Sequence, residues 1–231
     1  MTLSVKLFAD TANLGQMREI SDRVAGWTTN PSLMKAAGVS NYGWFANECV
    51  ETFPEHPISF EVVADDLATI RTQARSISLW GQNVYVKIPV SLRDGTSTLD
   101  LVRYLSHDGV KINVTAVFTS KQVYQTCEIL ANSPIPSYIS VFAGRIADTG
   151  VDPCPHVRTA VVCKGPNTEV IWASTREVYN IRQAEEVHCD IVTIAPEMLS
   201  KIGTFGKDLD SYSLETIGQF HRDAQLAGLT V

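Results

Sequence analysis

The sequence predicts an α/β protein made of a single (β/α)₈ (TIM) barrel over residues 1–231, with a C-terminal tail helix at about residues 213–227. Eight short β-prone runs recur along the chain, and segments with helical periodicity separate them. Strands that alternate with helices form a parallel sheet, and eight such strands can close into a barrel. At 231 residues and 45% hydrophobic content, the chain is long enough to fill one.

The eight β-prone runs lie between residues 6 and 195. They cover residues 6–10 ending at Asp10, 26–30 ending at Asn30, 58–62 around Glu61, 84–90 around Lys87, 110–118 around Asn113, 138–142 around Ser140, 170–174 ending at Ser174 and 189–195 ending at Ala195. An open doubly wound sheet is the structural alternative. No G-x-G-x-x-G motif follows the first run, which disfavours a dinucleotide-binding fold.

Helices are predicted between these runs from apolar residues at helical spacing. Examples are the sets Leu67, Ile70, Ala74, Ile77 and Val123, Cys127, Leu130. Hydroxyl side chains predict helix starts at Thr119-Ser120 and at Ser174-Thr175.

Charge and cysteine usage narrow the function classes. The net charge is −6 with scattered basic residues, so no nucleic-acid partner is predicted. The apolar runs are too short for a membrane span and the N-terminus reads as a strand, so a cytoplasmic location is expected. Five cysteines without a C-x-x-C pair indicate reduced, structural thiols. A metal site at Cys154, His156 and Cys163 is disfavoured by two prolines and irregular spacing, so neither metal nor cofactor is predicted.

Side-chain alternation divides each strand into an outer and an inner face. Val84, Val86, Ile88 and Val90 form one apolar set for helix packing, as do Val110, Ile112, Val114 and Ala116 in the next strand. The inward-facing sets are then Tyr85 and Lys87; Lys111, Asn113 and Thr115; Lys6, Phe8 and Asp10; Ser59 and Glu61; and Tyr138, Ser140 and Phe142. Polar residues at the carboxyl ends of barrel strands are typical of active sites.

An interior lysine favours its neutral amine, which can attack a ketone and form a Schiff base. Alternation leaves Lys6, Lys87 and Lys111 as equal candidates, and ion pairing in the barrel floor is the alternative for each. Aldol chemistry also needs a proton acceptor, for which Asp10 and Glu61 are the candidates. For Asp10, the simpler alternative is an N-cap on the helix that follows residues 11–13.

Six motifs occur in order along the chain: D-T-A at 10–12, W-T-T-N-P-S-L at 27–33, V-K-I-P at 86–89, K-I-N-V-T at 111–115, I-S-V-F-A-G-R at 139–145 and A-S-T-R at 173–176. Together they resemble the transaldolase family, in particular its short branch that includes fructose-6-phosphate aldolases. The G-K-D-L at 206–209 followed by a helix is also similar to the short branch. The resemblance spans nearly the whole chain.

The resemblance implies a role for each matching residue. It selects Lys87 as the Schiff-base lysine and Asp10 as acid/base at the C4 hydroxyl, with Glu61 and Thr115 holding a water that relays protons. It further implies that Asn30, Asn113 and Ser140 bind the dihydroxyacetone hydroxyls, that Phe142 lines the site, and that Arg145, Ser174 and Arg176 bind the sugar phosphate. Two guanidinium groups suit a dianion; exposed surface charge is the alternative for both.

Two residues resemble the transferases of the family rather than its aldolases, because the aldolase branch typically has Gln and Tyr where this chain has Glu61 and Phe142. The resemblance therefore implies a cytoplasmic transaldolase of carbohydrate metabolism, as in the pentose phosphate pathway, acting on fructose 6-phosphate and erythrose 4-phosphate. Fructose-6-phosphate aldolase cleavage is the alternative, as is transfer to a different aldose. Ser91, Val141, Ala143 and Thr175 depart from the family pattern and are expected to vary the lining of the site.

Two further classes are disfavoured. A deoxyribose-phosphate aldolase would show another motif order, and a non-catalytic sugar-phosphate binder would not be expected to keep Lys87, Asp10 and Glu61 together. In the tail helix, an apolar stripe at helical spacing is formed by Leu214, Ile217, Phe220, Ala224 and Ala227. Gly228 follows this stripe and is typical of a helix stop signal. Such a stripe usually packs within its own chain. The resemblance instead implies packing on a neighbouring subunit, in a homo-oligomer such as a pentamer or decamer.

Overall fold

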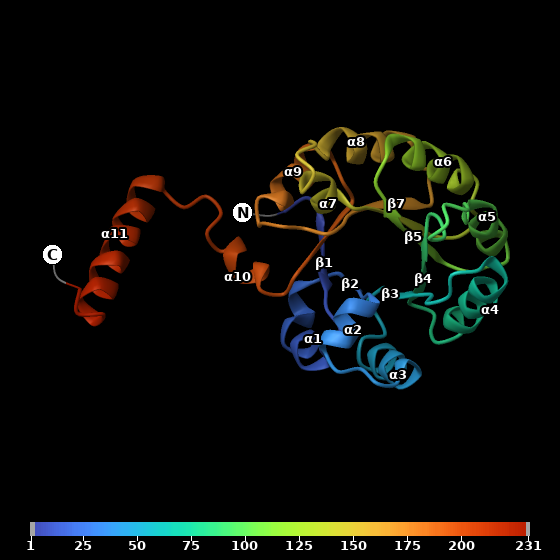
Figure 1. Cartoon of the computed structure of the whole chain (residues 1–231), viewed down its shortest axis with the longest axis horizontal. Helices are drawn as coiled ribbons and strands as arrows, with labels where there is room; N and C mark the ends of the chain where they lie inside the picture. The colour runs from blue at the N-terminus through green and yellow to red at the C-terminus, as the bar shows by residue number, and fades with distance from the viewer. Residues whose placement is uncertain (1–2, 230–231) are drawn as a thin grey trace.

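The computed structural model describes residues 3–229, and its eight parallel strands close into a barrel in sequence order (Figure 1). This confirms the predicted (β/α)₈ fold and excludes the open sheet. The strands are β1 Lys6–Asp10, β2 Gly26–Thr28, β3 Ile58–Glu61, β4 Val84–Pro89, β5 Ile112–Val117, β6 Ser137–Val141, β7 Thr168–Trp172 and β8 Ile191–Ile194. The prediction of one domain over residues 1–231 extends two residues beyond the described range at each end.

Most of the helices surround the barrel on its outer face (Figure 1). The helices of the described residues are α1 Leu14–Ile20, α2 Pro31–Ala36, α3 Tyr42–Thr52, α4 Leu67–Ser78, α5 Leu99–His107, α6 Ser120–Leu130, α7 Ala143–Ala147, α8 Cys154–Cys163, α9 Asn180–Glu186, α10 Met198–Ile202 and α11 Leu209–Leu226, with a 3₁₀ turn at Ser21–Arg23. The predicted start at Thr119 is confirmed, because its side chain forms a capping box with Gln122. The predicted start at Ser174-Thr175 is wrong: Ser174 has a left-handed backbone (φ 64°), and α9 begins only at Asn180.

Two hydrophobic layers confirm the predicted alternation in β4. Val84, Val86 and Ile88 belong to the large layer between strands and helices, whereas Tyr85 lies in a separate cluster inside the barrel. That inner cluster also contains Phe8 and Tyr138, and the Tyr85 and Tyr138 rings stack with centroids 4.0 Å apart. The lower barrel is thus filled by aromatic and aliphatic side chains, and open space is left near the carboxyl ends of the strands.

Strand β5 breaks the predicted alternation at Ala116. The register with β6 shifts between Val114 and Val117, and Ala116 adopts a left-handed backbone with φ 56°. The extra residue of this bulge moves Val117 to the outer layer and turns Ala116 toward the barrel mouth. The prediction that Ala116 faces the helices is therefore wrong.

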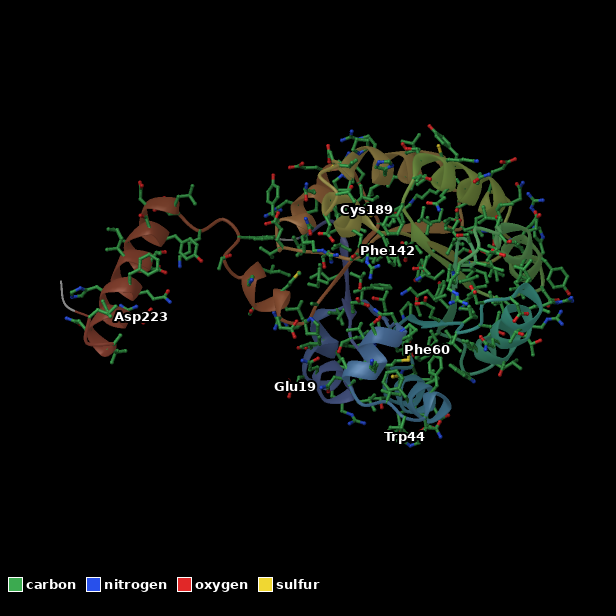
Figure 2. The ribbon with its side chains drawn as sticks, in the orientation of Figure 1. Glu19, Trp44, Phe60, Phe142, Cys189 and Asp223 are labelled. Atoms are coloured by element: carbon green, nitrogen blue, oxygen red, sulfur yellow. The ribbon has the colours of Figure 1, made fainter. Side chains whose placement is uncertain are left out.

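The tail helix α11 stands away from the barrel (Figure 1). It begins at Leu209, four residues before the predicted start, and Gly228 follows its C-cap with φ 64°. None of its residues is buried, and Leu214, Ile217 and Phe220 are 59–70% exposed. Figure 2 shows its side chains, such as Asp223, separate from those of the barrel. For the described residues, the prediction that the apolar stripe packs within its own chain is therefore wrong.

All five cysteines carry free thiols. Burial raises the pKa of Cys49, Cys127 and Cys189 to about 12 in each case, so these thiols stay protonated near neutral pH. His156 contacts the hydroxyl of Ser120 at 3.1 Å. Within residues 3–229, no three His, Cys, Asp or Glu side chains are arranged to hold a metal ion. No helix in the same range is long and apolar enough to cross a membrane.

Candidate active site

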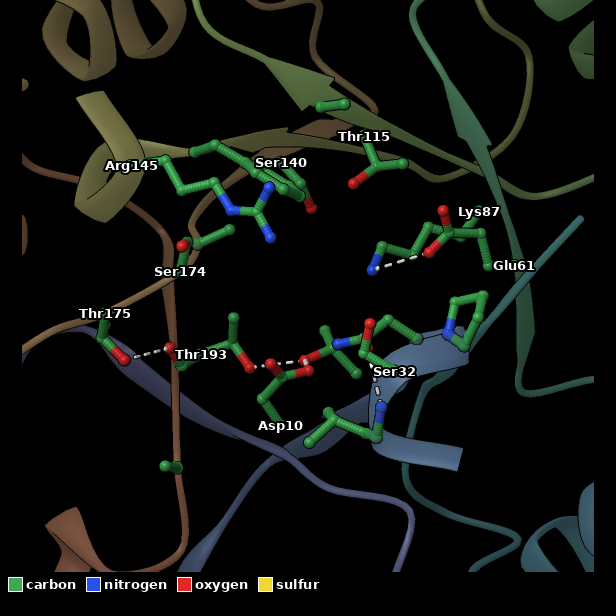
Figure 3. Close-up of a pocket in the computed structure, with 18 of the residues that line it drawn as sticks. Asp10, Ser32, Glu61, Lys87, Thr115, Ser140, Arg145, Ser174, Thr175 and Thr193 are labelled. Carbon is green, nitrogen blue, oxygen red and sulfur yellow. Dashed lines mark hydrogen bonds and ion pairs between the residues drawn. The ribbon is translucent and has the colours of Figure 1, made fainter. Parts of the chain in front are cut away.

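A cavity of about 530 Å³ opens at the carboxyl ends of the barrel strands (Figure 3). All of the predicted site residues except Asn113 line it: Asp10, Asn30, Glu61, Lys87, Thr115, Ser140, Phe142, Arg145, Ser174 and Arg176. These residues come from seven of the eight strands or the loops that follow them. Closure of the barrel therefore gathers side chains that are up to 166 positions apart (176 − 10).

Lys87 is the only lysine within residues 3–229 that lines this cavity. Lys87 is 5% exposed. Its Nζ donates a hydrogen bond to the Thr29 carbonyl at 3.0 Å and lies 3.3 Å from Glu61 Oε2. Lys6 instead pairs with Glu169 at the opposite end of the barrel, and Lys111 donates to the Gln82 carbonyl there at 2.6 Å. The geometry thus separates three lysines that strand alternation leaves equal.

Asp10 lies at the end of β1 and accepts a hydrogen bond from Thr28 Oγ at 2.8 Å. Asn13, not Asp10, caps α1, so the N-cap alternative for Asp10 is wrong. Burial raises the pKa of Asp10, although the charge of Lys87 and the Thr28 hydrogen bond partly offset the shift. A carboxyl group with a raised pKa accepts and returns a proton more readily near neutral pH.

Glu61 faces the same cavity from the end of β3 (Figure 3). Its side chain is 18% exposed and its partner is the Lys87 ammonium. Its backbone carbonyl accepts a hydrogen bond from Tyr42 of α3 at 2.9 Å, and the Tyr42 ring packs edge-on against Phe60 and Trp80. A rigid aromatic group therefore holds the strand end that carries Glu61.

Thr115 contributes a hydroxyl that is buried without a hydrogen-bond partner. It precedes the bulge residue Ala116, and both residues line the cavity. A buried hydroxyl that lacks a partner costs free energy, which a bound water or substrate oxygen recovers. Thr115 is therefore suited to hold a polar ligand.

Asn113 lies beneath the cavity and is fully buried. Its amide donates to Ser59 Oγ at 2.9 Å, and its carbonyl accepts from Ser140 Oγ at 2.8 Å. In this arrangement Asn113 fixes the orientation of Ser140, which does line the cavity. Asn30 is the N-cap of α2, where its Oδ1 accepts from the Leu33 amide at 3.0 Å.

Two arginines flank one end of the cavity in different ways. No ion pair to Arg145 occurs within residues 3–229, and its guanidinium lies 5.6 Å from the centre of the Phe142 ring. Arg176 is held by Asp148, with Nη2 2.6 Å from Oδ2, and its Nη1 donates to the Ser174 carbonyl at 3.0 Å. Arg145 thus makes no direct ion pair within residues 3–229, although its charge helps to lower the pKa of Asp148, whereas Arg176 is oriented by a direct ion pair with Asp148.

Backbone strain shapes the same corner. Ser174 has φ 64°, a conformation that costs a non-glycine residue about 1–2 kcal/mol. Its carbonyl presses on the start of α7, where a Cβ on Gly144 would lie 1.6 Å from that oxygen. Glycine at position 144 therefore permits the close approach that brings Ser174 next to Arg145 (Figure 3).

Several lining residues were not predicted, among them Thr28, Ser32 and Thr193. The signal that could have found Thr28 is its shared strand parity with the predicted residue Asn30, two positions further along. For Thr193 the signal is inward parity near the end of β8. Of the four departures from the family pattern, Thr175 lines the cavity.

The other departures lie elsewhere. Val141 and Ala143 are fully buried in the layer outside the barrel, so the expectation that they vary the lining is wrong. Ser91 follows β4 and bridges to Ser97, also outside the lining.

A sequence profile of the family described as "Transaldolase/Fructose-6-phosphate aldolase" matches residues 7–229. A probable transaldolase of Methanococcus maripaludis is 34% identical over 203 residues, which cover 86% of this chain and 89% of the relative. A probable transaldolase of Dehalococcoides mccartyi is 32% identical, with 86% and 90% covered.

Solved structures share the fold at low sequence identity. A tryptophan synthase α-subunit variant of Pyrococcus furiosus aligns with a TM-score of 0.60 at 10% identity, covering 92% of this chain and 96% of that one. The 3-hexulose-6-phosphate synthase of Salmonella typhimurium aligns with a TM-score of 0.58 at 13% identity, covering 83% and 89%. The barrel is common to these proteins, whereas the match of the profile is specific: the chain belongs to the transaldolase/fructose-6-phosphate aldolase family.

Proposed function

We propose that this protein is a transaldolase that transfers a dihydroxyacetone unit from a ketose phosphate to an aldose phosphate through a Schiff base on Lys87. The observation that carries the proposal is the position of Lys87: it is buried at the cavity, 3.3 Å from Glu61, and shares that cavity with Asp10. An amine in such a place is shielded from water and has acid/base groups beside it.

The covalent steps follow from these positions. Lys87 first gives a proton to the neighbouring Glu61 carboxylate. The resulting neutral amine attacks the C2 carbonyl of the ketose, and the carbinolamine loses water to give an imine. Glu61 and Thr115 face the cavity at this point and support the proton transfers. Asp10 takes the C4 hydroxyl proton as the C3–C4 bond breaks, so an aldose leaves and the C3 electron pair remains in an enamine.

The second half of the reaction reverses these steps with another aldose. The enamine carbon attacks the acceptor carbonyl, Asp10 returns its proton to the new hydroxyl, and water releases the product ketose from Lys87. Asn30 and Ser140 line the cavity and are proposed to bind hydroxyls of the retained three-carbon unit, with Asn113 orienting Ser140.

The positive end of the cavity supports phosphorylated substrates. Arg145, Ser174 and Arg176 are proposed to bind the phosphate of fructose 6-phosphate or sedoheptulose 7-phosphate as donor and of erythrose 4-phosphate as acceptor. Guanidinium groups supply the paired donors that a phosphate dianion requires. In a protein of net charge −6, this local cluster provides the attraction that the whole surface does not.

Cleavage to free dihydroxyacetone is the second candidate, and the cavity argues against it at Phe142. The Phe142 ring packs on Phe118 with centroids 5.5 Å apart and presents no hydrogen-bonding group to a hydrolytic water. An enamine kept from water survives until an acceptor arrives. Thr175 leaves transfer to a non-standard aldose as a variant of the same function, because it lines the cavity where the family usually has an aromatic residue.

The test is borohydride trapping with fructose 6-phosphate followed by peptide mass spectrometry, with and without erythrose 4-phosphate. The expected result is a three-carbon adduct on Lys87, which diminishes as sedoheptulose 7-phosphate forms. Absence of the adduct would contradict the covalent mechanism. An adduct accompanied by dihydroxyacetone release, without sedoheptulose 7-phosphate, would establish the aldolase instead.

We also propose a homo-oligomer in which α11 packs on a neighbouring subunit. The apolar residues Leu214, Ile217 and Phe220 are exposed on a helix that leaves its own barrel, which supports this arrangement. Size-exclusion chromatography of a chain ending at Gly206 should show a smaller assembly than the full chain. An unchanged assembly would rule out the exchange of tails.

A further inference from the structure

Three side chains from three neighbouring strands form a hydrogen-bonded chain that ends at Asp10. Thr28 Oγ donates to Asp10 Oδ1 at 2.8 Å, and Thr193 Oγ lies 2.6 Å from Thr28 Oγ. Strand β1 pairs with β2 on one side and with β8 on the other, so barrel closure brings these residues together. Thr28 and Thr193 are 2% and 4% exposed, which protects the chain from competing water.

The number of available protons fixes the direction of each bond. A threonine hydroxyl has one proton to donate. While Asp10 is ionised, the proton of Thr28 points to Asp10, so Thr193 must donate to Thr28. When Asp10 is protonated, it can donate to Thr28, and Thr28 can then donate to Thr193. The chain therefore has two polarities, and the charge of Asp10 selects between them.

The ends of the chain are held in place. Thr175 Oγ donates to the backbone carbonyl of Thr193 at 3.1 Å, which ties the end of β8 to the loop that follows β7 (Figure 3). The charged groups that share the cavity with Asp10 are Lys87, Glu61, Arg145 and Arg176. In Figure 3, Lys87 and Glu61 form an ion pair on one side and Thr193 lies beside Asp10 on the other.

We propose that Thr193 is a positioning residue that orients the Thr28 hydroxyl toward Asp10 and thereby supports the ionised, proton-accepting form of that carboxylate. The inference rests on the proposed function in one respect, that Asp10 is the acid/base of the aldol step. Thr193 acts through Thr28 and needs no contact with substrate.

The physical effect is an asymmetry between the two protonation states. A hydrogen bond to a carboxylate is about twice as strong as one between neutral groups, and a donor behind it strengthens it further. The chain therefore stabilises ionised Asp10 more than protonated Asp10. Loss of the Thr193 hydroxyl should raise the pKa of Asp10, and loss of the Thr28 hydroxyl should raise it more.

The experiment measures Asp10 directly. The γ-carbons of aspartate are labelled with ¹³C in the full-length protein, and the Asp10 signal is identified by its loss in Asp10→Asn. We expect Thr193→Val to raise the titration midpoint of Asp10 by about 0.3 pH unit, and Thr28→Val by about one unit. Thr193→Ser, which keeps the hydroxyl and removes only a methyl group, should restore the midpoint. Thr193→Ala tests the same loss if valine prevents folding.

Kinetics and trapping separate the possible failures. The pH at half-maximal activity on the acid side should shift with the Asp10 midpoint in each variant. A lower kcat with an unshifted midpoint would reduce Thr193 to a packing role and overturn the inference. Borohydride trapping is run on the same proteins. If an adduct forms on Lys87 but the Asp10 titration midpoint does not shift, only the role of Thr193 is ruled out. If the midpoint shifts but the wild-type protein forms no adduct, the proposed function is ruled out and the role of the hydrogen-bonded chain remains.

Discussion

A lysine contacts a glutamate at each end of the barrel. At the amino ends of the strands, which we call the floor, Lys6 Nζ lies 2.6 Å from Glu169, and the two side chains are 55% and 34% exposed. At the carboxyl ends, which we call the rim, Lys87 Nζ lies 3.3 Å from Glu61, and the side chains are 7% and 18% exposed. The residue types are the same, so the environment must account for any difference in chemistry.

The floor pair is screened by water and stands over a filled interior. Exposed ion pairs contribute about 0–1 kcal/mol to stability. The barrel above is closed by Phe8, Tyr85 and Tyr138. The rim pair instead borders an open cavity, and both of its side chains are largely buried. The position of a lysine along its strand therefore decides whether it is a candidate nucleophile, because only at the rim does buried space for a substrate lie beside it.

The largest expected effect comes from removing each lysine in turn. Lys87→Met should abolish the borohydride-trapped adduct and lower kcat by at least about 10³-fold, because no other amine lines the cavity within residues 3–229. Lys6→Met, the matched change at the floor, should leave the adduct on Lys87. Mass spectrometry of the trapped peptides gives the readout. An adduct that disappears in Lys6→Met and persists in Lys87→Met would reverse the comparison.

Asp10→Asn should lower activity but raise stability at neutral pH. Removing the acid/base group should lower kcat by about 10²–10⁴-fold. The pKa of Asp10 is raised in the folded protein, so the folded state binds the proton more tightly than the unfolded state does. The contribution of Asp10 to stability is therefore fully present below the unfolded pKa and is lost as pH rises through the folded pKa.

The amide cannot ionise and escapes this loss. Asp10→Asn should thus have a higher Tm than wild type at pH 7, with the difference shrinking as the pH is lowered toward 4. Thermal denaturation across this range measures the difference. Glu169→Gln at the floor is the control, and no comparable gain at neutral pH is expected there, because Glu169 is paired with Lys6 and partly exposed. Equal gains at both ends would show that burial at the rim has no special cost.

Much of the barrel could be predicted from the sequence because side chains alternate with period two along a strand. Alternation correctly separates Tyr85 from its neighbours Val84 and Val86. Alternation predicts which side of the strand a residue faces but not how near it lies to the rim. For that reason Lys6 and Lys87 could not be ranked. Lys6 is the first residue of β1, whereas Lys87 is the fourth of β4.

The features that could not be predicted depend on backbone outliers and on closure. The bulge in β5 turns Ala116 inward through one residue with positive φ, which no apolar pattern signals. The Thr28–Thr193 contact joins residues 165 positions apart, and it exists only because the last strand pairs with the first. Ser174 favours a helix start by its hydroxyl, yet its left-handed backbone delays α9 to Asn180.

The two arginines at the rim allow a comparison of an arginine without a direct ion pair within residues 3–229, Arg145, with one that has such a pair, Arg176. Arg145→Gln should raise KM for fructose 6-phosphate by about 10–10²-fold, because it removes the guanidinium that has no ion pair within residues 3–229. Arg176→Gln should have a smaller effect, since Asp148 already neutralises part of that charge. KM for unphosphorylated fructose should change little in either variant. A larger effect for Arg176 would show that orientation by Asp148 matters more than net charge.

The smallest expected effect concerns backbone strain at the two ends. Ala116 at the rim and His188, in the turn before β8 at the floor, both have φ 56°, where glycine avoids a cost of about 1 kcal/mol. Ala116→Gly and His188→Gly should therefore each raise the free energy of unfolding by up to about 1 kcal/mol, measured by urea denaturation.

The two variants should differ in activity. Ala116 adjoins Thr115 in the cavity lining, so added freedom there should lower kcat, whereas His188 is exposed and away from the cavity. If both variants gain stability and keep full activity, the strain at Ala116 is a consequence of strand geometry and plays no part in holding the Thr115 hydroxyl in place.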